Sequence, residues 1–249
     1  MDELRMRGLI TFEAGGKREH QEDAFKVNKD RGIAVVADGF GGPVGGREAA
    51  DKACEGVLDF LQNKVGDLDA TLPFEMRKYF TLGGNILFNA LLHANHQLMR
   101  RNEKFGIHEK GGASVVAGYL MDGVLSVANI GVCEAYLFRQ KKVIPLVSPR
   151  TYGRFLDPFS RGRDNTGWDI PLSALGVTDD MQPELVEMRA EPEDWVLFTT
   201  DGMTPVVLED LQQGILNEKS LESGLEIARD ILECADPSDN LAISLFFIG

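Results

Sequence analysis

Residues 35–42, VVADGFGG, form an apolar, β-branched run that ends in a single carboxylate, Asp38, and continues into glycines. This pattern is typical of a buried strand that presents one aspartate at its open end, because aspartate is unfavourable within a strand and costly to bury without a metal or a cation. Glycine lets neighbouring backbone carbonyls approach a ligand closely. A strand followed by a tight turn, with Asp38 capping the next helix, explains the stretch equally well. Other carboxylates in the same setting would favour a ligand site.

The composition is that of an ordinary globular protein. The chain has 249 residues, of which 43% are hydrophobic and 26% charged. Its formal net charge of −13 argues against nonspecific nucleic-acid binding and against docking on an anionic membrane. It contains no signal-peptide-like start and no apolar run long enough to span a bilayer. The three cysteines have no paired spacing, which fits a reducing compartment. We therefore expect one domain over residues 1–249, located in the cytoplasm.

Hydrophobic periodicity predicts both strands and helices along the chain. The first three strands follow at short spacing, which favours antiparallel neighbours and would bring residues 22–23 near Asp38. Residues 73–102 predict one helix that is broken or loosened near Gly83 and Gly84. The expected strands are 8–14, 24–27, 33–37, 113–120, 124–130, 134–139, 185–188, 195–200 and 241–248, with 113–139 as a meander that turns at 121–123. The other expected helices are 47–61 and 221–234.

The setting of Asp38 recurs. Asp201 follows a second apolar strand and precedes glycine, and Asp239 stands where the chain enters the last strand. Together with Glu22 and Asp23, these acidic residues lie at the ends of strands that are far apart in sequence. A sheet can gather such ends at one edge. Each aspartate alone is more often a turn or cap residue, and it is the repetition that favours a shared site.

Carboxylates held this close would repel one another and would not all stay ionised unless cations neutralised them. All-oxygen ligation suits Mg²⁺ or Mn²⁺ rather than zinc. Two such ions about 3.5–4 Å apart can hold a hydroxide at neutral pH and aim it at phosphorus. Phosphate monoesters hydrolyse extremely slowly without such help.

Five motifs in order indicate a family. The chain resembles the metal-dependent protein phosphatases of the type 2C family, in their compact bacterial form, and the resemblance covers nearly the whole chain. The motifs are REHQEDA (18–24) for Arg-x-x-Asn-Glu-Asp-Ala, VADGFGG (36–42) for Val-Ala-Asp-Gly-Met-Gly-Gly, GAS (112–114) for Gly-Thr-Thr, TDGMT (200–204) for Ser-Asp-Gly-Leu-Thr, and DNL (239–241) for Asp-Asn-Ile.

The resemblance implies an α+β fold, a four-layer α-β-β-α sandwich with two central antiparallel sheets flanked by helices and metals at one end. It implies hydrolysis of phosphoserine and phosphothreonine in proteins by a hydroxide that bridges two Mn²⁺ or Mg²⁺ ions. The enzyme would be a monomer that opposes a Ser/Thr kinase in bacterial signalling. The implied site residues are Asp38, Asp201 and Asp239 as direct metal ligands with the Gly39 carbonyl, Glu22 and Asp23 as ligands through water, and Arg18 on the phosphate.

Three positions depart from the family. Val132 replaces an aspartate associated with a third, weaker metal, and valine cannot ligate. Phe40 stands where some eukaryotic members carry a candidate acid histidine, so that protonation of the leaving group would fall to a metal-bound water. Pro43 replaces a residue that is often histidine in bacterial members.

The loop at 148–170 occupies the variable flap region of the family. It carries a local basic cluster within an acidic chain, namely Arg150, Arg154, Arg161 and Arg163. These arginines either contact phosphorylated protein substrates or belong to a solvated loop.

Two rival functions remain open at this point. A catalytically silent relative, acting as a binding or regulatory module, is favoured only by Val132, because the core aspartates are all present. A metallohydrolase acting on small phosphoesters would need a substrate panel to exclude it.

Overall fold

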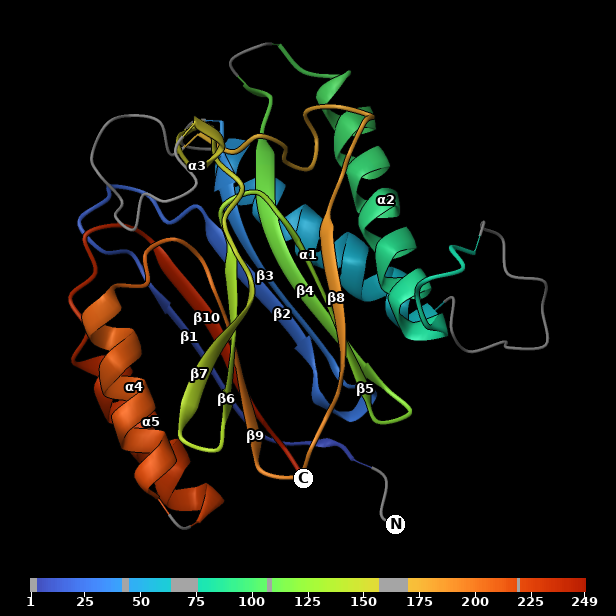
Figure 1. Ribbon diagram of the computed structural model, residues 1–249. Helices are drawn as coiled ribbons and strands as arrows, with labels where there is room; N and C mark the ends of the chain where they lie inside the picture. Colours follow the sequence, from blue (N-terminus) through green and yellow to red (C-terminus); the bar gives the residue numbers. More distant parts are fainter. Residues whose placement is uncertain (1–3, 42–44, 64–75, 107–108, 157–169, 219) are drawn as a thin grey trace.

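The computed structural model describes residues 4–41, 45–63, 76–106, 109–156, 170–218 and 220–249. These residues form two five-stranded sheets that pack face to face, with helices on both outer sides (Figure 1). All neighbouring strands are antiparallel. The arrangement is the four-layer α-β-β-α sandwich expected from the sequence, and it confirms the predicted fold class.

The first sheet has the order β1 (Met6–Ala14), β10 (Leu241–Ile248), β9 (Asp194–Thr199), β6 (Glu134–Arg139) and β7 (Lys142–Val147). The second has the order β2 (Asp23–Asn28), β3 (Ile33–Phe40), β4 (Gly112–Met121), β5 (Val124–Ile130) and β8 (Glu184–Arg189). Helices α4 (Pro205–Asn217) and α5 (Leu221–Glu233) cover the first sheet, and α1 (Gly45–Asn63) and α2 (Leu82–Asn102) cover the second. Two short helices, η1 (Lys29–Arg31) and α3 (Tyr152–Leu156), lie in connections.

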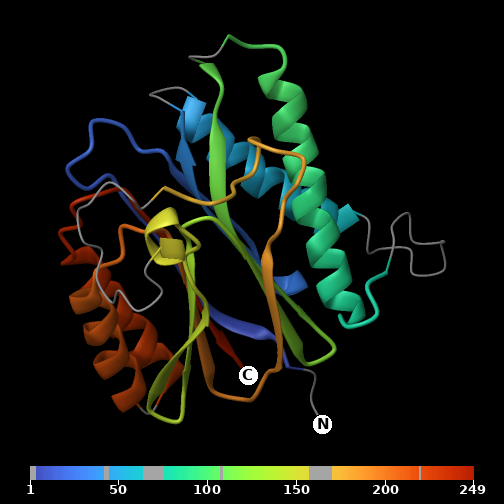
Figure 2. The same ribbon diagram turned by 45° about the horizontal axis from the view of Figure 1, so that its top comes forward.

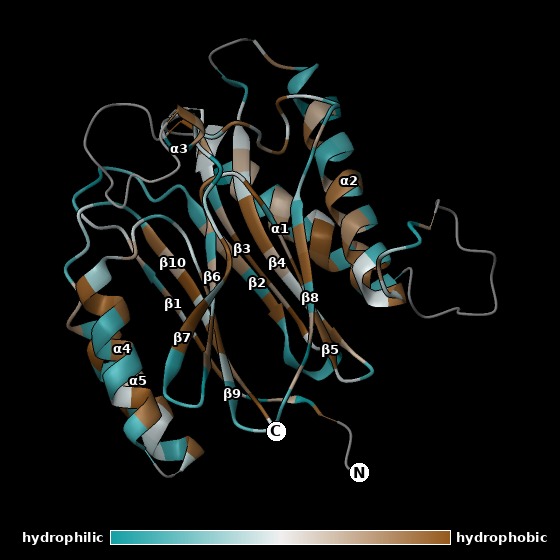
Figure 3. Ribbon diagram, viewed as in Figure 1, coloured by the Kyte–Doolittle hydropathy of each residue, from teal (hydrophilic) through white to brown (hydrophobic). Residues whose placement is uncertain are grey.

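Strand β3 is buried on both faces, which explains its continuous apolar sequence. Val35 and Ala37 pack against α1 and α2, whereas Ala34 and Val36 point between the two sheets. Hydrophobic residues accordingly gather on the strands, while α4 and α5 show hydrophilic and hydrophobic residues in alternation (Figure 3). A strand held from both sides gives Asp38, near its end, a fixed position.

The structure corrects several expected elements. The helix expected at 73–102 begins at Leu82, because Thr81 caps it and accepts a hydrogen bond from the Gly84 N–H (3.2 Å). Residues 73–75 lie outside the described part, and 76–81 are not helical. The expected meander is wrong in its third strand, since β6 crosses to the other sheet. Strand β7 and helix α4 were not expected.

The ends of β3 and β9 and the starts of β2 and β10 lie at one end of the sandwich, opposite the chain termini (Figures 1 and 2). Helix α3 lies over the same end, while residues 157–169 of the expected flap are outside the described part. Of the helices in the described ranges, none combines the length and apolarity required to cross a bilayer.

Candidate metal centre

Asp23 and Asp38 sit directly opposite each other in the β2–β3 pair. The pKa of Asp23 is raised to about 7, chiefly by burial and also by the negative charges of Asp201 and Asp239, while hydrogen bonds from Thr200 and with Asp38 oppose the rise. Burial also raises the pKa of Asp38 well above its usual value, with added repulsion from Asp201, Asp23 and Asp239. The cluster therefore cannot be fully ionised at neutral pH without added positive charge.

Asp201 and Asp239 reach the same place from the first sheet. The turn at Asp201 and Gly202 packs directly on the backbone of Asn240, where a Cβ on Gly202 would overlap the Asn240 carbonyl. Close backbone approach of this kind requires glycine. This contact explains how Asp201 and Asp239 come together, as the sequence analysis expected of the strand ends. The charges of both residues act on Asp23 and Asp38.

Arg18 makes a two-pronged ion pair with Asp239. Its Nε and Nη2 atoms donate to Oδ1 (2.7 Å) and Oδ2 (2.6 Å). The Arg18 side chain remains 63% exposed, against 35% for Asp239. The pair raises the pKa of Arg18, and the charges of Asp201 and Glu22 raise it further. The expected phosphate-binding cation thus lies at the carboxylate cluster, bound to one of the expected metal ligands.

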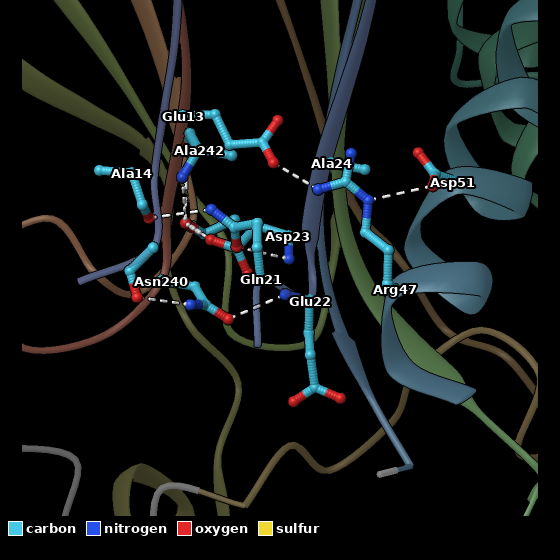
Figure 4. Close-up of polar contacts among 12 residues, drawn as sticks. Glu13, Ala14, Gln21, Glu22, Asp23, Ala24, Arg47, Asp51, Asn240 and Ala242 are labelled. Atoms are coloured by element: carbon cyan, nitrogen blue, oxygen red, sulfur yellow. Dashed lines mark hydrogen bonds and ion pairs between the residues drawn. The ribbon is translucent and has the colours of Figure 1, made fainter. Parts of the chain in front are cut away.

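Glu22 is fixed by its backbone and not by its side chain. Its N–H donates to Asn240 Oδ1 (2.9 Å), and its carbonyl accepts the Gly39 N–H (3.2 Å). Its carboxylate lies against Gly46, and burial raises its pKa. Its Oε1 atom is buried and has no hydrogen-bond partner within the part of the chain that the structure describes. The side chain points away from the network around Asp23 (Figure 4). A buried oxygen without a protein donor is suited to a cation or a water.

Sequence reasoning assigned no role to three residues that hold these carboxylates. Gln21 accepts the Asp23 N–H (3.0 Å) and donates to the carbonyl of Ala14 (2.9 Å), as Figure 4 shows. Asn240, besides holding Glu22, donates to the Gly15 carbonyl (2.9 Å). Thr200 is hydrogen-bonded to Asp23. All three lie inside the motifs quoted above. Their position in those motifs was the one sign in the sequence that they could support the site.

The donor set fits Mn²⁺ or Mg²⁺ by three observations. Every expected donor is oxygen, and the pKa values of Asp23 and Asp38 are raised by burial and by mutual repulsion. Glu22 Oε1 has no hydrogen-bond partner among the described residues. The present side-chain positions do not complete a site, since no three His, Cys, Asp or Glu residues of the described part are arranged to hold a metal ion. The Arg18–Asp239 pair accounts for part of this. In the present arrangement both carboxylate oxygens of Asp239 accept hydrogen bonds from Arg18.

Of the three departures from the family, Val132 and Phe40 lie within the described residues, and their side chains can neither ligate a metal nor act as an acid. Val132 is buried, 5% exposed, and has no atom that can ligate. The Phe40 ring packs against Gly112, where a Cβ would contact it, and it supplies no acid. Pro43, Arg161 and Arg163 lie outside the described residues. Arg150 is exposed and donates to the Gln182 carbonyl (3.1 Å), and Arg154 lies in α3.

No family model matches the chain. It is 24% identical over 253 residues to the serine/threonine phosphatase Stp of Listeria welshimeri, covering 96% of this chain and 95% of that protein. It is 24% identical to a putative protein phosphatase 2C-type of Streptococcus pyogenes, covering 96% of both. The catalytic domain of the phosphatase PstP, solved with two manganese ions, superposes with a TM-score of 0.75 at 19% identity, covering 98% of this chain and 99% of that one.

Over nearly its whole length the chain is similar to PP2C-type protein phosphatases. The full-length match to PP2C-type relatives agrees with the ordered motifs, and the structural likeness agrees with the sandwich fold. Both Listeria and Streptococcus relatives are spanned almost end to end.

We expect Gly39→Ala to lower the free energy of unfolding by about 1–3 kcal/mol, because the added Cβ would overlap the Gly46 carbonyl and approach the Glu22 carbonyl at 2.7 Å. Gly15→Ala is the matched control, since its added Cβ would have no atom within 4 Å among the described residues beyond its two chain neighbours. Urea unfolding at fixed pH measures both. Equal stability of the two variants would contradict the close backbone approach at Gly39.

Proposed function

We propose that this chain hydrolyses phosphoserine and phosphothreonine in proteins and depends on two Mn²⁺ or Mg²⁺ ions. The observation that carries the proposal is the meeting of Asp23, Asp38, Asp201 and Asp239, from both sheets, around one exposed arginine. Such crowding is destabilising by itself and is typical of functional sites. The relatives, whose names describe serine/threonine and 2C-type phosphatases, support the same reading.

We assign the metal positions as follows. Asp38, Asp201 and Asp239 would ligate directly with the Gly39 carbonyl, and Asp38 would bridge the two ions, while Glu22 and Asp23 would ligate through water. When bound, the ions supply a water activated at neutral pH and positive charge for the phosphoryl oxygens. The raised pKa values of Asp23 and Asp38 and the unpartnered Glu22 oxygen support this assignment.

Arg18 would bind the phosphoryl group of the substrate. The two N–H groups that now grip the Asp239 oxygens at 2.7 and 2.6 Å present the spacing that a phosphate needs. Its high exposure leaves it free to turn towards a substrate. Asp38 and Arg18 are accordingly the residues we assign to catalysis.

The wider context is part of the proposal. We place the protein in the cytoplasm as a monomer of one domain that acts on phosphoproteins made by a Ser/Thr kinase. Its three cysteines, Cys54, Cys133 and Cys234, are all free thiols, which suits a reducing compartment. Arg150 and Arg154, next to the site end, would contact the substrate.

The test is hydrolysis of phosphothreonine and phosphoserine peptides with Mn²⁺, with and without chelator. We expect turnover that disappears with chelator and returns with Mn²⁺, and a higher kcat/KM for the peptides than for p-nitrophenyl phosphate. Turnover that chelator does not affect would contradict the metal role. Peptide binding without turnover would favour a silent binding module, and preference for the small ester would favour a small-phosphoester hydrolase.

A further inference from the structure

We propose that Thr200 is a positioning residue that fixes the orientation of Asp23 and joins the two halves of the carboxylate cluster. This inference rests on the proposed function, because it concerns the metal-binding geometry of that site. Thr200 itself needs to touch neither metal nor substrate, and its effect is exerted through Asp23.

The hydrogen bonds of Thr200 determine where its hydroxyl proton points. Thr200 is fully buried and directly follows β9. Its Oγ1 accepts the N–H of Ala242 (2.9 Å), so the proton is free for another acceptor. Asp23 Oδ2 lies at 2.6 Å, against 3.5 Å for the Ala242 carbonyl. The hydroxyl therefore donates to Asp23 in a short, charge-assisted hydrogen bond.

This hydrogen bond occupies Oδ2 of Asp23 and leaves Oδ1 available to the rest of the carboxylate cluster. Asp23 is only 1% exposed, and its backbone is held separately by Gln21. With Oδ2 tied to Thr200, rotation of the carboxyl group is restricted, and Oδ1 keeps one direction. Fixed orientation of this kind is how outer residues tune metal ligands.

The same bond crosses between the two sheets at the site. Thr200 is paired with Ala242 through its own N–H (3.0 Å) and so belongs to the β9–β10 side, next to Asp201. Asp23 belongs to β2, opposite Asp38. The Thr200–Asp23 bond thus sets the separation between ligands from the first sheet and ligands from the second.

The neighbouring residue provides a matched control. Thr199 is also fully buried, and its hydroxyl donates to the carbonyl of Thr200 (3.0 Å), without a carboxylate partner. Thr199→Val and Thr200→Val remove the same atom at adjacent buried positions. Thr200→Val also leaves the Ala242 N–H without its side-chain acceptor, so a purely structural role of Thr200 would lower stability more than Thr199→Val does but would not weaken Mn²⁺ binding more.

The experiment is calorimetric titration of Mn²⁺ into the metal-free full chain, with thermal unfolding in chelator beside it. We expect Thr200→Val to weaken Mn²⁺ binding about tenfold or more, the usual effect of losing a residue that orients a ligand. Thr200→Ser, which restores the hydroxyl, and Thr199→Val should remain within about threefold of wild type.

The inference is overturned if Thr200→Val binds Mn²⁺ like wild type, or if Thr200→Ser or Thr199→Val loses as much affinity. It is also overturned if Thr200→Val fails to fold while Thr199→Val folds, because Thr200 would then serve the fold. A wild-type chain that binds no Mn²⁺ would remove the proposed function as well, which separates the two failures.

Discussion

Asp38→Asn is expected to lower kcat/KM for Mn²⁺-dependent phosphopeptide hydrolysis by about 10³-fold or more, since loss of preorganised charge at a reaction centre has effects of this order. Asn keeps the size of the side chain but removes the charge that two cations would share. The steady-state assay is run at saturating Mn²⁺, so that weaker metal binding alone cannot produce the loss. Activity within tenfold of wild type would contradict the role of Asp38.

Although Asp38→Asn should lower activity, it should make the metal-free chain less sensitive to pH. In the metal-free chain the pKa of Asp23 is raised to about 7 and that of Asp38 is raised as well. In the unfolded chain the pKa values of both aspartates lie at about 4. The folded chain therefore holds protons that the unfolded chain has lost, and stability decreases as pH rises from about 4 to about 7.

Asp38→Asn removes one of the repelling charges, so metal-free stability should decrease less over this range than in wild type. Urea unfolding in chelator at several pH values measures the difference. A variant as pH-sensitive as wild type would show that the carboxylates are not electrostatically crowded.

Arg18→Ala has the second largest expected effect, a loss of about 10²-fold in kcat/KM with a gain in Mn²⁺ affinity. The activity falls because a bidentate contact to the phosphoryl group is lost. The affinity rises because Asp239, no longer paired at 2.7 and 2.6 Å with Arg18, is available to the metal. Arg18→Lys should recover little activity, since a lysine cannot form the planar fork.

Phosphopeptide kinetics and Mn²⁺ titration of the same preparations test both parts. Arg229→Ala, which removes an exposed arginine from the outer helix α5, is the control and should change neither value. Unchanged kcat/KM would exclude Arg18 from the site, and weakened Mn²⁺ binding would contradict its competition with the metal.

Strand-end carboxylates were predictable because their pattern is local. An apolar run that ends in Asp-Gly is visible in the sequence at Asp38 and again at Asp201. The expected ligands could therefore be named from the sequence. Their partners could not be named in this way. That Arg18 pairs with Asp239 and Thr200 with Asp23, across 221 and 177 residues respectively, depends on how the two sheets pack.

The fold errors have similar causes. The connection from β5 to β6 is as short as a hairpin, but Gly131 adopts a positive φ of 99° there and β6 joins the other sheet. Periodicity does not distinguish these outcomes. Strand β7 contains Pro145 on an exposed edge, which weakened its pattern. Helix α4 was signalled by Thr204 and Pro205, a cap followed by a first-turn proline, and could have been found.

The most direct test of the central claim is a crystal structure of the protein with Mn²⁺, with the ions located by their anomalous scattering. We expect two peaks about 3.5–4 Å apart at the end of the sandwich, within ligand distance of Asp38, with Asp201 and Asp239 on the ions and Arg18 turned away from Asp239. A structure grown with saturating Mn²⁺ that shows no peak at these aspartates would contradict the account.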